Sequence, residues 1–196
     1  FMGWLGLDDT DHLGGGCTTK TLDELISNLP KNVSVGELRL VRLWPFAKQR
    51  TRGNAAVAVQ LSTEKENDLM IHLDDWWNRK IKPLAGKVTD SDDYHREQFA
   101  TDPGMVWFSN KIPEDAFYYD AVRREVKLSD IPDADKSWGG HGRIGATAAV
   151  AWSKSNITFE AIAWRSQDGE YQENVRRIDS KRLQEIDAMK DTFMSR

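Results

Sequence analysis

The sequence of this 196-residue chain predicts an α/β (α+β) fold, and three observations support that class. Short β-rich segments alternate along the chain with segments of helical periodicity, as in a sheet covered by helices. Hydrophobic residues make up 39% and charged residues 30%, which is the balance of a chain that folds around a core. Two β-rich segments, 33–44 and 54–62, are joined by a loop, which favours some antiparallel pairing within a mixed sheet.

The first elements follow from local patterns. The apolar run GWLGLD (3–8) predicts a buried strand whose C-terminal end presents aspartates. Leucine and isoleucine at spacings of three and four predict a helix over 18–29, with Thr18 or Thr19 near its N-cap. The segments at 33–44 and 54–62 favour β structure, alternate well enough in polarity and are predicted to be neighbouring strands.

The rest of the chain continues the alternation. The predicted elements are a helix over 63–82, a strand over 104–110, a helix after Pro113, a glycine cluster running into an Ala-rich segment over 137–153, a strand over 157–165 and a helix over 172–193. Composition shifts near residues 63 and 136. We therefore expect a discontinuous domain, 2–62 with 136–196, that holds an inserted subdomain over 63–135.

Composition also excludes some classes of function. The formal net charge of −4 argues against binding nucleic acid through bulk electrostatics. No apolar run approaches the roughly 18 residues of a membrane span. The single cysteine, Cys17, excludes an internal disulfide and a cysteine-rich zinc site, and a cytoplasmic setting is the simplest expectation.

Three aspartates, Asp8, Asp9 and Asp11, follow the first predicted strand within four positions. One of them is explained by a turn in which the side chain caps backbone N–H groups, but such a turn explains three poorly. Crowded carboxylates need a cation or donors, and Mg²⁺ prefers one or two carboxylates with phosphate oxygens. The glycines at 14–16 and the following Thr18 and Thr19 add N–H donors at a helix start, which favours a metal or phosphate site.

Two further segments have phosphate-binding chemistry. Residues 139–145, GGHGRIG, contain G-x-G-x-x-G, but no strand of the dinucleotide-binding kind precedes them. A purely structural glycine loop and a loop that approaches phosphates therefore remain equally good interpretations. In RTRGNAAV (50–57), Arg50 and Arg52 provide planar guanidinium groups that can donate to phosphate, and Asn54 provides an amide. This signal is weak by itself, because arginines are common on protein surfaces.

Taken in order, these pieces resemble a known family. GLDDTD, GGGCTTK, RLWPFAKQRTRGNAAV, DPGMVWF, GRIGATAAVAW and FEAIAWR succeed one another between residue 3 and about residue 165. Each is a poor signal alone, whereas the ordered set is specific. The set resembles the archaeal 2-agmatinylcytidine synthetases, which modify the anticodon cytidine of a minor isoleucine tRNA at the expense of ATP.

The resemblance implies that 2–62 with 136–196 form a kinase-like, ATP-binding catalytic domain and that 63–135 form a small ferredoxin-like subdomain. It also implies ATP and Mg²⁺ as cofactors, and tRNA and agmatine as partners. It implies that Asp8, Asp9 and Asp11 are catalytic and hold Mg²⁺ and the ATP phosphates, and that Thr18 accepts a phosphoryl group. The expected ATP- or phosphate-binding residues are Gly15, Gly16, Thr19, Arg52, Asn54, Gly140, Gly142 and Gly145.

The chain also departs from the family pattern. Family members continue into an OB-fold and a cysteine-bearing zinc ribbon that grip tRNA, and neither is expected in a chain that has one cysteine and ends at Arg196. We therefore expect either part of a longer enzyme or a short relative. A small-molecule kinase and an ATP-binding sensor built on the same module stay open as alternatives.

Overall fold

An antiparallel sheet of five strands, in the order β2-β3-β1-β4-β5, organises the computed structural model of the chain. The structure describes residues 1–12, 14–50, 53–87, 99–153 and 181. The chain divides into two compact units, 1–157 and 158–196, and the sheet with its covering helices lies in the first. Within the described residues, no helix has the length and apolar character that a membrane span requires.

The strands follow the alternation expected from the sequence. They are β1 (Met2–Asp8), β2 (Ser34–Arg42), β3 (Ala55–Ser62), β4 (Gly104–Phe108) and β5 (Lys136–Gly139). β1 lies at the centre of the sheet and pairs with β3 on one side and with β4 on the other. Its last residue, Asp8, is therefore held at the end of a fully paired strand.

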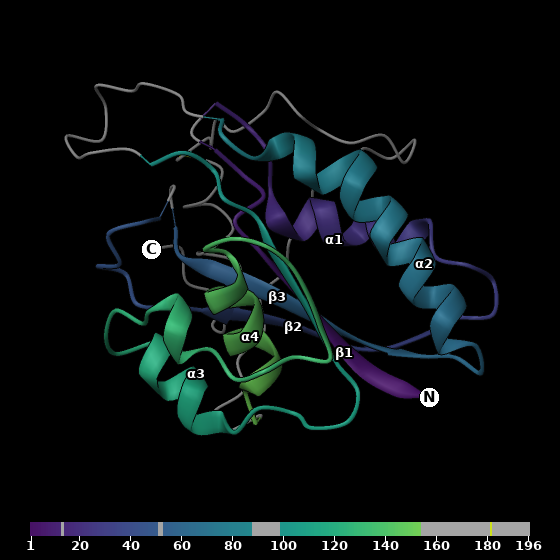
Figure 1. The fold of residues 1–196 in the computed structure, drawn as a ribbon. Coiled ribbons are helices and arrows are strands. Elements are labelled where there is room, and N and C mark those ends of the chain that lie inside the picture. The colour runs from purple at the N-terminus through teal and green to yellow at the C-terminus, as the bar shows by residue number, and fades with distance from the viewer. Residues whose placement is uncertain (13, 51–52, 88–98, 154–180, 182–196) are drawn as a thin grey trace. The chain divides into compact units, whose positions relative to one another are not determined.

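Helices cover both faces of the sheet. They are α1 (Thr18–Ser27), α2 (Glu66–Trp76), α3 (Asp115–Ala121) and α4 (Arg143–Ala151), together with the π-helical turn η1 (Trp77–Ile81) and the 3₁₀ turns η2 (Lys82–Leu84) and η4 (Leu128–Asp130). In Figure 1, α1 and α2 lie on one side of the sheet, and α3 and α4 on the other.

Strand β1 divides its side chains between the two layers, because successive residues of a strand point to opposite faces. Leu5 and Leu7 belong to the core formed with α1 and α2. Trp4 belongs to the core formed with α3 and α4. Gly6 faces the same way, and a Cβ atom built there would collide with the backbone of Ala146 in α4. Helix α4 therefore packs directly against the backbone of the central strand.

The observed fold confirms the predicted α/β (α+β) class. A mixed sheet was expected, and every strand pairing that the structure describes is antiparallel. No strand was predicted where the short strand β5 lies. Its own sequence has no clear strand pattern, and its pairing with β4 orders it. The strand predicted over 157–165 and the helix predicted over 172–193 lie outside the described residues.

The segment 63–135, predicted to be an inserted subdomain, contributes α2, β4 and α3 to this unit. Strand β4 pairs with β1 from Trp4–Phe108 to Asp8–Gly104. The segment thus supplies part of the sheet that also contains β1 and β3, and it shares both cores with them.

Candidate active site

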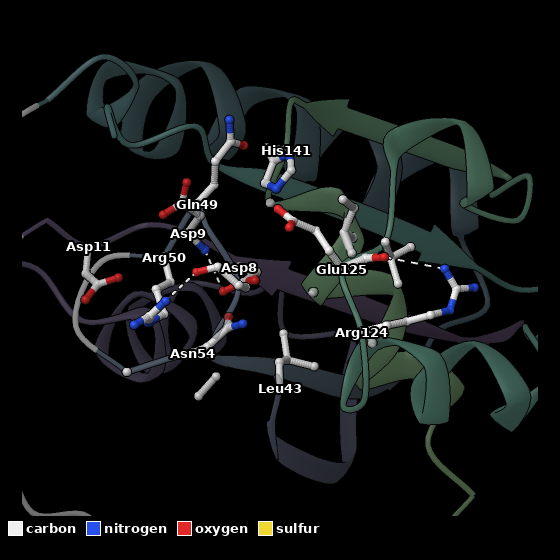
Figure 2. Close-up of a pocket in the computed structure, with 18 residues that line it drawn as sticks. Asp8, Asp9, Asp11, Leu43, Gln49, Arg50, Asn54, Arg124, Glu125 and His141 are labelled. Atoms are coloured by element: carbon white, nitrogen blue, oxygen red, sulfur yellow. Dashed lines mark hydrogen bonds between the residues drawn. The ribbon is translucent and has the colours of Figure 1, made fainter. Parts of the chain in front are cut away.

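A pocket lies where the C-terminal end of β1 meets the beginning of α4. Three carboxylates, Asp8, Asp9 and Asp11, line one part of it (Figure 2). Gly142 and Gly145, from the start of α4, line it beside Asp8. A fully paired strand and the first turn of a helix thus place acidic side chains and backbone N–H groups around one space.

The two carboxylates at the end of β1 are unfavourable as anions in this environment. Burial and then the neighbouring charge of Asp9 raise the pKa of Asp8 well above its usual value, although the N–H of Asp9 donates to Asp8 Oδ1 at 2.7 Å. Burial also raises the pKa of Asp9 to about 6, with a smaller contribution from the charge of Asp11. A bound cation would offset the burial of these charges and the repulsion between them, because it favours the ionised form of each carboxyl group.

The backbone of Asp9 is unusual. Its φ of 56° lies in the left-handed region, which residues other than glycine seldom adopt and which is enriched at functional sites. Its Oδ2 atom accepts a hydrogen bond from the backbone N–H of Asp102 at 2.7 Å. The orientation of the Asp9 carboxylate is therefore set by a segment 93 residues further along the chain.

Helix α4 approaches Asp8 closely because small residues lie at the contact. A Cβ atom built at Gly145 would overlap Asp8 Oδ2, and one built at Gly142 would lie 2.8 Å from the carbonyl oxygen of Asp8. The N–H groups of Gly142, Arg143 and Ile144 already donate to backbone carbonyl oxygens. The start of α4 still carries the positive end of the helix dipole, which lies beside the carboxylates.

Other walls of the pocket combine apolar and polar side chains. Leu43, Ala121, Val126 and Ile144 line it, all of them buried. Such a surface accepts the face of a flat ring such as a nucleobase, whereas the carboxylates and the helix start favour a charged group.

Two polar residues, Glu125 and His141, lie on the other side of Asp8 from Arg50 (Figure 2). Burial lowers the pKa of His141, against the opposing effect of the Asp102 and Glu125 charges. A lowered pKa favours a neutral imidazole at neutral pH, which can act as a donor and an acceptor toward a ligand.

The loop between β2 and β3 contributes Gln49, Arg50 and Asn54. The Asn54 side chain donates to the carbonyl oxygen of Trp44 at 2.8 Å, which fixes the beginning of this loop. The Arg50 guanidinium donates to the carbonyl oxygen of Ala47 and so folds back over its own loop. Arg52 lies outside the described residues.

Six of the predicted site residues meet in this pocket. They are Asp8, Asp9, Asp11, Asn54, Gly142 and Gly145. The structure does not bring Gly15, Gly16, Thr18, Thr19 or Gly140 to its lining.

The predicted residues that do not line the pocket have other surroundings. Thr18 begins α1, and its buried hydroxyl lies 3.2 Å from the hydroxyl of Thr10. Thr19 lies 2.9 Å from the sulfur of Cys17, and Gly140 lies against the Asp102 carboxylate. The two hydroxyls at the start of α1 therefore have partners within the protein, Thr10 for Thr18 and Cys17 for Thr19.

Sequence reasoning missed Leu43, Gln49, Arg124, Glu125 and Val126 as pocket residues. No short-range pattern distinguishes them, because they come from loops and helix ends that only the folded sheet brings together. In the sequence, Asp102 is part of DPGMVWF, a piece of the family pattern to which no site role is assigned.

The carboxylates are suited to a metal that also takes ligands from a bound substrate. Among the described residues, no group of three or more His, Cys, Asp or Glu side chains is placed to hold a metal ion by itself. Mg²⁺ needs only one or two carboxylates when phosphate oxygens and waters complete its shell. Asp8 and Asp9, adjacent and both with a raised pKa, fit that requirement.

An α/β module with a carboxylate-rich pocket at a helix start is the class of protein that fold and site define. Family models narrow the class, because residues 4–142 match the TiaS TCKD domain and residues 140–195 match the TiaS FLD domain. The chain therefore belongs to the TiaS family.

Curated relatives agree with this assignment. The chain is 36% identical over 173 residues to the isoleucine-tRNA 2-agmatinylcytidine synthetase TiaS of Pyrobaculum neutrophilum, which covers 85% of this chain and 39% of the relative. It is 32% identical over 199 residues to the protein of that name from Methanopyrus kandleri, covering 95% of this chain and 42% of the relative. The chain thus spans about two fifths of the length of these relatives.

Solved structures share the fold. The crystal structure of a complex of TiaS with an isoleucine tRNA and ATP matches with a TM-score of 0.65 at 24% identity, covering 85% of this chain and 40% of the other. The crystal structure of a complex of TiaS with an isoleucine tRNA, AMPCPP and agmatine matches with a TM-score of 0.67 at 21% identity. This match covers 95% of this chain and 44% of the other. At these identities the likeness concerns the fold.

Proposed function

We propose that this chain is the ATP-using part of an isoleucine-tRNA 2-agmatinylcytidine synthetase, which activates the anticodon cytidine for conjugation with agmatine. The observation that carries the proposal is the pair Asp8 and Asp9, whose carboxylates have raised pKa values beside the start of α4. Membership of the TiaS family supports the choice of reaction. ATP, Mg²⁺, tRNA and agmatine are the ligands proposed with it.

In the proposed site each group has a distinct role. Asp8 and Asp9 hold Mg²⁺, with Asp11 at the margin of the same pocket. The start of α4, with the positive end of the helix dipole, lies beside the ATP phosphates, and the apolar wall takes the base. The bound ion neutralises phosphate charge, and phosphoryl transfer otherwise depends on positioning and on electrostatic stabilisation.

The family boundaries also lead us to propose a domain division. In this proposal the kinase-like domain corresponds to residues 4–142 and the ferredoxin-like domain to 140–195, in place of the ferredoxin-like subdomain expected over 63–135. Helix α4 then lies where the two matches meet, with its first residues at the pocket.

Calorimetric titration with ATP, with and without Mg²⁺, tests the proposal. We expect magnesium-dependent binding by the wild-type chain and its loss in Asp9→Ala and in Asp11→Ala, with unchanged circular dichroism. The matched control is Asp135→Ala, an exposed aspartate that is not part of the pocket lining. Equal ATP affinity in the wild type and both pocket variants would reject the metal role.

Thr18 needs a separate test because its hydroxyl is buried beside Thr10 and does not line the pocket. We propose that it accepts a phosphoryl group from ATP. Incubation with γ-labelled ATP should label the wild-type chain and not Thr18→Ala, while Thr19→Ala, the neighbouring hydroxyl, should keep the label. Full labelling of Thr18→Ala would remove this residue from the mechanism.

Turnover distinguishes the proposed enzyme from its alternatives. We expect the unmodified minor isoleucine tRNA together with agmatine to stimulate ATP hydrolysis. Hydrolysis stimulated only by small acceptors would indicate a small-molecule kinase. Binding without any hydrolysis would indicate a sensor.

A further inference from the structure

Asp102, which immediately precedes Pro103 and β4, contacts two parts of the site through three different groups. Its backbone N–H donates to Asp9 Oδ2 at 2.7 Å. Its carboxylate Oδ2 accepts the backbone N–H of His141 at 2.7 Å, and its carbonyl oxygen accepts that of Gly142 at 2.9 Å. Asp102 therefore links the aspartates after β1 to the loop that begins α4.

We infer that Asp102 is a positioning residue for the proposed nucleotide site, holding the 140–142 loop in register with Asp9. The inference rests on the proposed function. It goes further by assigning a role to a residue that does not line the pocket of Asp8 and Gly145.

The backbone and the side chain of Asp102 contribute to this positioning in different ways. The backbone N–H of Asp102 occupies one oxygen of the Asp9 carboxylate and thereby fixes its direction. The Asp102 side chain accepts the backbone N–H of His141 and lies against Gly140, so it fixes the position of the 140–142 loop. A hydrogen bond to a carboxylate oxygen is stronger than one between neutral groups, so this contact favours one conformation of the loop.

Replacing the side chain separates these contacts. Asp102→Ala keeps the backbone N–H that binds Asp9 and removes only the acceptor of the His141 N–H. Asp102→Asn keeps an oxygen that can accept the same N–H and should rescue the function. Because the Asp102 side chain is exposed, neither change should impair folding.

The same pair of strands provides a matched control. β4 and β5 pair from Gly104–Gly139 at one end to Trp107–Lys136 at the other. Asp102 anchors the first end, at the pocket. Asp135 anchors the second, where its exposed carboxylate accepts the backbone N–H of Ser109 at 2.6 Å. Asp135→Ala therefore removes an equivalent anchor away from the site.

The experiment measures the Kd for MgATP by calorimetry and the exchange of the His141 backbone amide by NMR. For Asp102→Ala we expect roughly tenfold weaker MgATP binding, equivalent to about 1.4 kcal/mol, and roughly tenfold faster His141 exchange. Asp102→Asn should stay within about twofold of the wild type in both, as should Asp135→Ala. The core amides of β1 should exchange at the same rate in every variant.

Two results would overturn the inference. MgATP affinity in Asp102→Ala equal to that of Asp135→Ala would show that the loop anchor does not serve the site. Unchanged protection of the His141 amide in Asp102→Ala would show that there is no anchor. Absence of MgATP binding in the wild type would instead reject the proposed function, and amide exchange alone would then decide whether Asp102 holds the loop.

Discussion

The two faces of the sheet differ in the size of their central residues. Toward α1 and α2, Leu5 lies between Val59 and Trp107 on the paired strands. Toward α4, the next row places Gly6 between Ala58 and Val106. The first face fills its core with large side chains, and the second lets a helix backbone approach the strand.

This difference teaches how the pocket is formed. Large side chains in the row of Leu5 bury apolar area, which stabilises the unit as a whole. Small residues on the other bring α4 against β1, so that Gly145 meets Asp8 at the end of the strand. One face therefore contributes mainly stability, and the other mainly the geometry of the site.

The largest expected effect comes from the large-residue face. Leu5→Ala should lower the free energy of unfolding by about 3 to 4 kcal/mol, because it leaves a cavity in a fully buried core. Urea denaturation measures the change. Leu38→Ala on β2, where the side chain is 59% exposed, is the control and should change stability by less than about 0.5 kcal/mol. Equal losses in the two variants would contradict the comparison.

The small-residue face should respond to the opposite change. Gly6→Ala should cost about 2 to 3 kcal/mol, because the new methyl group meets backbone atoms of Ala146 that cannot turn aside. Gly15→Ala, whose methyl group would meet its nearest neighbour at 3.9 Å, should be nearly neutral. A Gly6→Ala protein as stable as Gly15→Ala would mean that α4 does not pack this closely.

The two regions should also differ in their response to pH. Asp9 has its pKa raised to about 6, so the folded state binds the proton more tightly than the unfolded chain. In metal-free buffer stability should therefore rise by about 1 to 2 kcal/mol as pH falls from 7 to 4. Asp74, beside the core of the other face, has its pKa lowered by its hydrogen bonds to Lys136 and Trp138. Its contribution is present above pH 3.8 and is lost as pH falls below that value.

Thermal unfolding between pH 7 and pH 3 measures both trends. Asp9→Asn should reduce the gain in stability as pH falls toward 4. Asp74→Asn should reduce the loss of stability at lower pH. A wild-type stability that stays constant between pH 7 and pH 5 would show that burial and charge repulsion do not destabilise the ionised carboxylates after β1.

The smallest effect on stability is expected at the pocket end of α4. Gly145→Ala places its methyl group against the end of the Asp8 side chain, which can rotate away, and alanine also favours the helix. Stability should change by less than about 1 kcal/mol, whereas the displaced Asp8 should weaken MgATP binding roughly tenfold. A loss of stability equal to that of Gly6→Ala would remove the distinction between the two glycines.

Much of the fold could be predicted because its signals are local. The apolar run GWLGLD places Asp8 at the end of a strand, and the helix predicted over 18–29 is observed at Thr18–Ser27. These patterns depend on a few adjacent residues, and the long-range contacts reinforce them. The strand β5 could not be predicted, because a four-residue segment is ordered only by its partner β4.

The site was predictable only in part for the same reason. The aspartates and the glycines of α4 stand out as residue types, and the fold brings Asp8, Gly142 and Gly145 together. Glu125 lines the pocket without any pattern of its own, and Asp102 acquires its three contacts only when β4 is in place. The predicted roles of Thr18 and Arg52 stay predictions.

By itself the sequence determined the fold class, the acidic end of β1 and the family pattern, because each is encoded in the type and spacing of neighbouring residues. Only the tertiary structure decided how closely α4 approaches β1 and which loops surround Asp8. Those features depend on contacts between segments about 90 to 140 residues apart, such as Asp9 with Asp102 and Asp8 with Gly145. The physical reason is steric: a helix can approach that closely only over a strip of small residues that the sheet assembles from separate strands.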